Sequence, residues 1–169
     1  MRRRNRRRGA AMVEFALAGI GSCFVLICTF QLAMAMWNYH TLAYAVHEAS
    51  RYAAVKGVDC TKPGNTCSAT IADIAHKIAA RGIGLPAGAV NVTLTTDSGA
   101  ATSCNPLNSC YSNATVWPPA ANNDNAVGKK ITVTAHCTFA GTLFFWPGAG
   151  KVRIGAVSFP ASSTQTILF

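Results

Sequence analysis

The sequence has few acidic residues and a long stretch near its start with no charge at all. Only 6 of its 169 residues are Asp or Glu, against 15 Lys and Arg, and no charged residue occurs from Phe15 to His47. Proline is absent before Pro63, so no residue in this stretch forces a helix to break. The uncharged run exceeds the about 20 apolar residues that a helix needs to cross a bilayer. We therefore predict a long helix that spans a membrane.

Motifs of enzymes and of nucleotide or metal sites are also lacking. The chain has no Gly-x-Ser-x-Gly elbow, no Walker loop and no dinucleotide-binding glycine fingerprint. Outside the apolar run, Glu48 and four aspartates are too scattered to suggest an acid–base pair. His40 and His47 share a helix face, but no third ligand at a typical spacing accompanies them. We expect no cofactor, no metal and no enzymatic activity.

The basic residues are concentrated at the N-terminus. Without residues 1–9 the net charge falls from +9 to +3. An arginine block before an apolar segment is a cytoplasmic topology signal under the positive-inside rule. A nucleic-acid surface is the weaker interpretation, because no second basic patch interleaved with aromatic residues follows. The N-terminus should thus lie in the cytoplasm and the bulk of the chain outside. The topology signal comprises Arg2, Arg3, Arg4, Arg6, Arg7 and Arg8.

Helical periodicity continues beyond the apolar segment. We predict one helix from about Ala10 to Lys56, ended by Gly57, roughly 70 Å long. Residues 10–37 would be its transmembrane part and residues 38–57 a stalk. The stalk repeats apolar residues at spacings of three and four, which predicts one buried face. That face holds Tyr39, Leu42, Val46, Ala49 and Ala53.

Residues 58–169 should form a small extracytoplasmic head. A second helix, capped by Ser68, would run to about Arg81. Three later runs alternate with the period of two that is typical of half-buried strands. The stem helix would cover the resulting sheet, which gives an α+β fold with an antiparallel sheet of about three strands. A long loop, 97–128, separates the first two strands. The three predicted strands are 90–96, 130–139 and 151–159.

The seven cysteines fall into two groups. Two lie in the apolar run, where they would pack as small apolar residues. The other five would face an oxidising compartment, where disulfides form. Spacing favours two local bridges and leaves one cysteine over, although spacing alone does not fix connectivity. The membrane pair is Cys23 and Cys28, the favoured bridges are Cys60–Cys67 and Cys104–Cys110, and the remaining cysteine is Cys137.

One short motif carries a resemblance to a known family. After the arginine block the chain reads Gly-Ala-Ala-Met-Val-Glu-Phe, from Gly9 to Phe15, and an apolar helix follows. This order resembles the processing site of type IV-like prepilins, and most closely the TadE-like (TadE/TadF) pseudopilins of tight-adherence (Tad/Flp) pilus systems. The segment Glu48–Ala54 also resembles the end of the stem in that family.

The resemblance implies a pilin-like fold and a structural role as a minor pilin or pseudopilin in an adhesion pilus. A prepilin peptidase would cut between Gly9 and Ala10 and remove residues 1–9 as a basic leader. Glu14 would serve recognition or assembly, with Phe15 at the matching aromatic position. The new amine at Ala10 would lie about one helical turn from Glu14, which suits a charge pair between neighbouring subunits.

Expected partners and location follow from the same resemblance. The partners would be the peptidase, other pilin subunits, the inner-membrane assembly platform and membrane lipid, with no nucleic acid. The chain would cross the bacterial inner membrane once.

A second interpretation comes from a different class of protein. Residues 1–35 could be a secretory signal peptide, cut after Ala35, or an anchor for a binding domain. Against the signal peptide, Glu14 interrupts the start of its apolar region. The apolar segment is also longer than the about 15 residues that such signals use.

Overall fold

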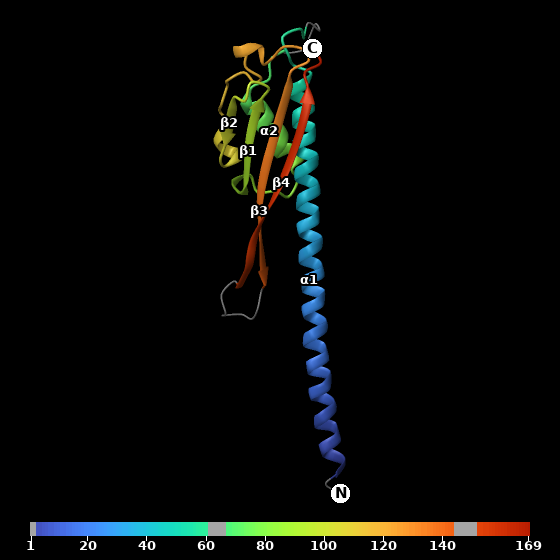
Figure 1. Cartoon of the computed structure of the whole chain (residues 1–169). Helices are drawn as coiled ribbons and strands as arrows, with labels where there is room; N and C mark the ends of the chain where they lie inside the picture. The colour runs from blue at the N-terminus through green and yellow to red at the C-terminus, as the bar shows by residue number, and fades with distance from the viewer. Residues whose placement is uncertain (1–2, 61–66, 144–151) are drawn as a thin grey trace.

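One long helix supports a small head at its C-terminal end (Figure 1). The computed structural model describes residues 3–60, 67–143 and 152–169, with backbone alone for 3–10, 140–143 and 152–155. The helix, α1, spans Arg3–Ala54 and has 52 residues, so it is about 78 Å long. The predicted start at Ala10 is wrong, because the arginines before it favour helix and a single Gly9 costs only about 1 kcal/mol. The helix also ends at Ala54, before the predicted Lys56.

The head contains a four-stranded antiparallel sheet. The strands are β1 (Val90–Thr96), β2 (Ala101–Cys104), β3 (Lys130–Leu143) and β4 (Val152–Thr166), in the order β2-β1-β3-β4. The α+β class is confirmed and β1 has its predicted bounds. β2 was missed, however, and β3 and β4 are longer than predicted. β4 continues through Pro160, which an edge strand tolerates because its outer N–H groups need no ladder partner.

The second helix, α2 (Ile71–Arg81), begins with a capping box at Thr70. The Thr70 hydroxyl accepts a hydrogen bond from the Asp73 N–H (3.1 Å), and the Asp73 carboxylate accepts one from the Thr70 N–H (3.0 Å). Two otherwise unpaired N–H groups are satisfied in this way. The prediction of Ser68 as the cap was therefore wrong by two residues.

The core lies between the helices and one face of the sheet (Figure 1). The predicted stalk stripe is confirmed from Leu42 onward, while Tyr39 stays 39% exposed. The opposite face of the sheet carries threonine and serine, and cross-strand hydroxyl pairs join Thr132 to Thr164 (2.9 Å) and Thr134 to Ser162 (3.1 Å). The buried side chains include Leu42, Val46, Ala49, Ala53, Ile74, Ile78, Val92, Leu94, Ile131 and Val133.

The predicted loop 97–128 is well organised. Besides β2 it holds two 3-10 helices, Leu107–Cys110 and Ala121–Asn123, and Trp117 is buried in the core. Its backbone pairs with the residues before α2, since the Trp117 N–H donates to the Ala69 carbonyl (2.8 Å). Disulfides join Cys60 to Cys67 and Cys104 to Cys110, and Cys137 is a buried free thiol.

Candidate membrane-anchoring and assembly site

The first part of α1 is apolar and largely exposed. Phe15 is 81% exposed, Leu26 68% and Trp37 61%, whereas Leu42 is completely buried. From Ala11 on, the helix is long and apolar enough to cross a membrane, with a mean hydropathy of 2.1 in its most apolar window. Exposed apolar surface of this extent marks an interaction with a membrane or a partner.

Glu14 stands on the surface of this bare helix. Arg2 lies outside the described residues, whereas Arg3, Arg4, Arg6, Arg7, Arg8, Gly9 and Ala10 form the first turns of α1. α1 is continuous from Gly9 through Phe15. Glu14 is exposed and makes no ion pair with any residue whose side chain the structure describes. A carboxylate so close to an apolar helix segment therefore lacks a partner among these described side chains.

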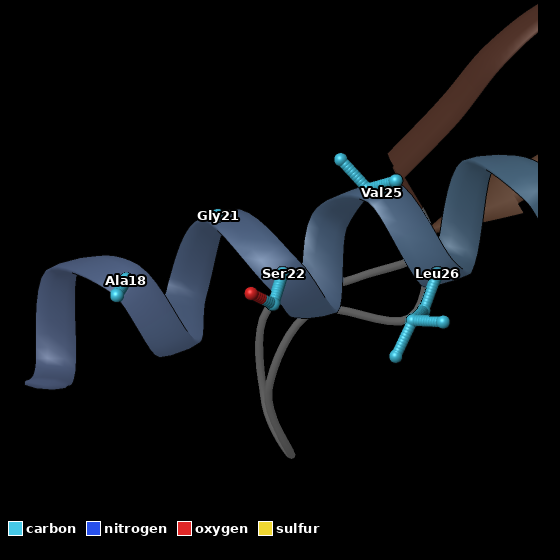
Figure 2. Close-up of a pocket in the computed structure, with 5 residues that line it drawn as sticks. All are labelled: Ala18, Gly21, Ser22, Val25 and Leu26. Atoms are coloured by element: carbon cyan, nitrogen blue, oxygen red, sulfur yellow. The ribbon is translucent and has the colours of Figure 1, made fainter.

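Small residues leave shallow grooves on the bare helix (Figure 2). One groove is lined by Ala18, Gly21, Ser22, Val25 and Leu26, and a neighbouring one includes Gly19 and Cys23. A methyl group added at Gly19 or Gly21 would meet nothing within 4 Å. These glycines are thus not required by packing within the described chain, and they leave room for a second helix to approach closely.

Two contacts fix the direction of the stem relative to the head. The hydroxyl of Ser50, which is completely buried, donates to the His47 carbonyl (2.8 Å) and pairs with the Ser163 hydroxyl on β4 (2.8 Å). Just past the helix, a Cβ at Gly57 would collide with the Phe169 carbonyl oxygen and the Ile167 side chain. The end of α1 is therefore packed directly against the end of β4.

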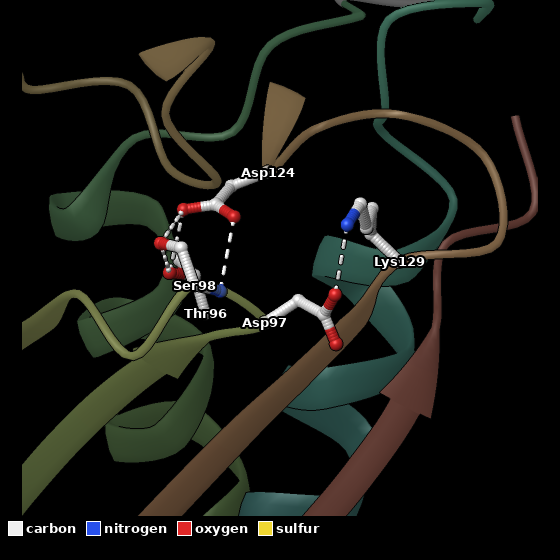
Figure 3. Close-up of polar contacts among 5 residues, drawn as sticks. All are labelled: Thr96, Asp97, Ser98, Asp124 and Lys129. Carbon is white, nitrogen blue, oxygen red and sulfur yellow. Dashed lines mark hydrogen bonds and ion pairs between the residues drawn. The ribbon is translucent and has the colours of Figure 1, made fainter. Parts of the chain in front are cut away.

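A buried carboxylate ties the predicted loop to the end of β1 (Figure 3). Asp124 is 1% exposed. It accepts hydrogen bonds from the Ser98 hydroxyl (2.5 Å), the Thr96 hydroxyl (2.7 Å) and the Ser98 N–H (3.2 Å). These bonds, led by that of the Ser98 side chain, lower the pKa of Asp124 below its ordinary value. The carboxylate is thus held ionised as a structural acceptor.

The remaining ionisable groups of the head also have structural roles. Lys129 forms an exposed ion pair with Asp97 (2.9 Å), which raises the pKa of the lysine. The hydrogen bond from the Thr70 N–H, followed by that of its side chain, lowers the pKa of Asp73. Burial raises the pKa of the Cys137 thiol, which favours its neutral form.

The four histidines are dispersed. His40 contacts the ring of Tyr39, and His76 stacks on Tyr111 with 4.6 Å between ring centroids. His47 and His136 are exposed. Across the ranges 3–60, 67–143 and 152–169, no three His, Cys, Asp or Glu residues gather closely enough to hold a metal ion.

Sequence reasoning missed the polar residues that organise the head. Ser50 follows Ala49, a residue of the predicted apolar stripe. This place on the helix was the one feature of the sequence that indicated its burial. Asp124 gave no signal, because its partners Thr96 and Ser98 are 28 and 26 residues away. The Cys104–Cys110 disulfide and the Asp124 carboxylate together order the segment 97–128, whose composition is typical of a loop.

Comparison with known proteins gives one match. The family model described as TadE-like protein matches residues 9–51, from Gly9 through the bare part of α1 to its junction with the head. Over this segment the chain is similar to TadE-like proteins. No curated protein and no solved structure matches the chain.

Proposed function

We propose that this TadE-like chain is a minor pilin or pseudopilin of a Tad (type IV-like) adhesion pilus. The observation that carries the proposal is the division of one helix: α1 is packed into the head from Leu42 to Ala54 and largely exposed from Ala11 to Trp37. A bare apolar stem can lie first in lipid and later in a bundle of like helices. The match over residues 9–51 covers this stem. The role is structural, in pilus initiation, at the tip or in the scaffold.

The leader supports processing before assembly. The arginine block would hold residues 1–9 in the cytoplasm, where a prepilin peptidase cuts between Gly9 and Ala10. The mature chain would stay in the bacterial inner membrane, crossing it once with the head outside. In this proposal its partners are the peptidase, lipid, other pilin subunits and the assembly platform.

Glu14 would set the register between subunits. After cleavage the Ala10 amine lies four residues away, about 6 Å along the helix. A carboxylate without a partner is costly once lipid or other helices surround it. A neighbouring subunit's Ala10 amine would remove that cost, and the grooves at Gly19 and Gly21 would allow the two helices to approach.

Cleavage tests the proposal with a matched pair of variants. The chain is expressed with and without a prepilin peptidase, and its mass is measured. We expect the peptidase to remove residues 1–9 from the wild type and from Gly21→Val, but not from Gly9→Val. Equal masses with and without the peptidase would overturn the processing step.

A further inference from the structure

The last two strands extend beyond the sheet. Pairing of β1 with β3 stops at Val90 and Cys137, whereas pairing of β3 with β4 continues to Leu143 and Val152. Residues 138–143 and 152–158 therefore form a two-stranded extension, here called the β3–β4 ribbon. An isolated pair of strands is marginally stable in water and needs a surface to pack against.

The ribbon runs back along α1 toward its N-terminus (Figure 1). The ring of Phe159 on β4 meets that of Tyr39 on α1, with 6.2 Å between centroids. From Phe159 to the start of β4 at Val152 the strand covers roughly 23 Å. That distance equals about 15 residues of helix, so the ribbon reaches the level of about Phe24. In Figure 2 the ends of its strands come into view beside the turn that carries Val25 and Leu26.

Burial along α1 agrees with this placement. Beyond the head, a row of residues at spacings of three and four is half-buried, in line with Leu42, while most of their neighbours are exposed. From Leu42 toward the C-terminus, the same face of the helix packs on the sheet, and the ribbon continues that sheet toward the N-terminus of α1. One side of α1 is therefore shielded down to about the same level. The row comprises Ile27, Cys28, Gln31, Ala35 and Asn38.

The end of the ribbon lies within about 10 Å of the outer boundary of a bilayer that α1 spans, on its inner side. A span of about 20 residues that starts at Ala11 ends near Phe30. The strands of the ribbon read TFAGTL and VRIGAVS, with Arg153 as their single charge. Apolar residues with one long basic side chain suit the boundary between headgroups and acyl chains. Deeper insertion is excluded, because unpaired strand edges have no partners in hydrocarbon.

We propose that the β3–β4 ribbon rests at the outer boundary between headgroups and acyl chains of the membrane that α1 spans. This inference depends on the proposed membrane anchorage. The head then touches the bilayer at two places, α1 and the ribbon, which fixes its height and its rotation about the stem. Extraction of a subunit from the membrane must break the ribbon contact as well as withdraw α1.

Depth-dependent fluorescence quenching tests the contact. Cys23, Cys28 and Cys137 are replaced by alanine in the full chain, the disulfides are kept, and one cysteine is labelled with an environment-sensitive dye. The labelled positions are Val152→Cys in the ribbon, Thr166→Cys at the far end of the same strand, and Ile20→Cys in the span. Each protein is placed in phosphatidylethanolamine–phosphatidylglycerol vesicles with nitroxide lipids. Val157→Cys serves as a second ribbon position if Val152→Cys does not fold.

We expect shallow nitroxides to lower the fluorescence of the ribbon dye at least about twofold. The dye at Thr166 should instead be quenched by iodide in the aqueous phase. A ribbon dye that behaves like the Thr166 dye overturns the inference. A ribbon dye that neither the nitroxide lipids nor iodide quench also overturns the inference, because it would indicate that a second copy of the chain covers the ribbon. If the anchorage itself is wrong, the Ile20 dye is not quenched by deep nitroxides, so the two failures are distinguishable.

Discussion

Ser50 of α1 and Ser163 of β4, 113 residues apart in the chain, share a hydrogen bond of 2.8 Å between their hydroxyls. Ser50 is completely buried, so this bond lies inside the head, near the end of α1. It joins a helix that also carries the exposed apolar segment to the strand that also carries the ribbon. The direction of the stem relative to the head is thus fixed by packing at a few positions.

Replacing Ser50 should loosen this junction. Ser50→Leu adds volume where there is no space, and we expect the free energy of unfolding to fall by about 1–3 kcal/mol. Ser50→Ala removes one hydrogen bond and should cost about 1 kcal/mol. Denaturant unfolding in detergent measures both. Equal stability of Ser50→Leu and wild type would show that the site is not closely packed.

Gly57→Ala tests the contact between the end of α1 and the end of β4. The new methyl group would collide with the Phe169 carbonyl oxygen and the Ile167 side chain, so we expect a loss of about 1–3 kcal/mol. Gly88→Ala is the matched control, because a methyl group there meets nothing within 4 Å. If both variants unfold at the same denaturant concentration, the two ends are not packed as described.

The capping box predicts an asymmetry between two nearby residues. Thr70→Ala removes the side-chain acceptor of the Asp73 N–H and should destabilise the protein by about 1 kcal/mol. Ser68→Ala, two residues earlier, should have little effect. Thermal unfolding followed by circular dichroism compares the two variants. A larger loss of stability for Ser68→Ala than for Thr70→Ala would show that Thr70 is not the cap.

Stability should decline in acid, and Asp124 should contribute to the decline. Hydrogen bonds from Ser98 and Thr96 lower its pKa in the folded state. Its stabilisation is therefore complete above the unfolded pKa, about 4, and is lost as the pH falls through the lower folded value. Asp124→Asn should lower the melting temperature by several degrees at pH 7 and flatten its decline below about pH 4.

Asp97→Asn is the control for that experiment. Asp97 also bonds a partner, Lys129, but the two side chains are 36% and 42% exposed. Exposed ion pairs contribute little to stability, so this variant should melt near the wild type. An unchanged acid profile for Asp124→Asn would contradict the structural role of the buried carboxylate.

Glu14→Gln separates assembly from processing. The variant keeps the shape of the side chain and removes its charge, so we expect it to reach the membrane. Incorporation into sheared pili should fall about tenfold or more, as expected for a buried charge left without its partner. Glu48→Gln, higher on the same helix, should assemble normally. Normal assembly of Glu14→Gln would refute the register proposal.

The parts of the fold that sequence predicts are those with strong local periodicity. The stripe from Leu42 to Ala53 and the alternation of β1 both report burial directly, and both lie where expected. β2 has only four residues and one buried side chain, so it gives almost no periodic signal. Pro160 reads as the end of a strand, yet β4 continues through it because no strand pairs with its outer edge.

In the candidate site, too, sequence predicts the local features and misses the contacts between residues that are far apart in the chain. The apolar run, the arginine block and Glu14 are visible in sequence, because membrane topology depends on local composition. The Ser50–Ser163 bond, the Asp124 cluster and the ribbon beside α1 depend on residues far apart in the chain. Such contacts exist only once the sheet has formed, and no local pattern predicts them.

The most direct measurement is the N-terminal sequence of the mature protein from its native membrane. A start at Ala10 is the predicted result, since it would place the new amine one turn from Glu14 at the head of a bare apolar stem. A start at Met36 would contradict the account, because the chain would then lose its membrane helix and be a secreted binding domain. An intact leader would also contradict it and leave a plain membrane-anchored protein.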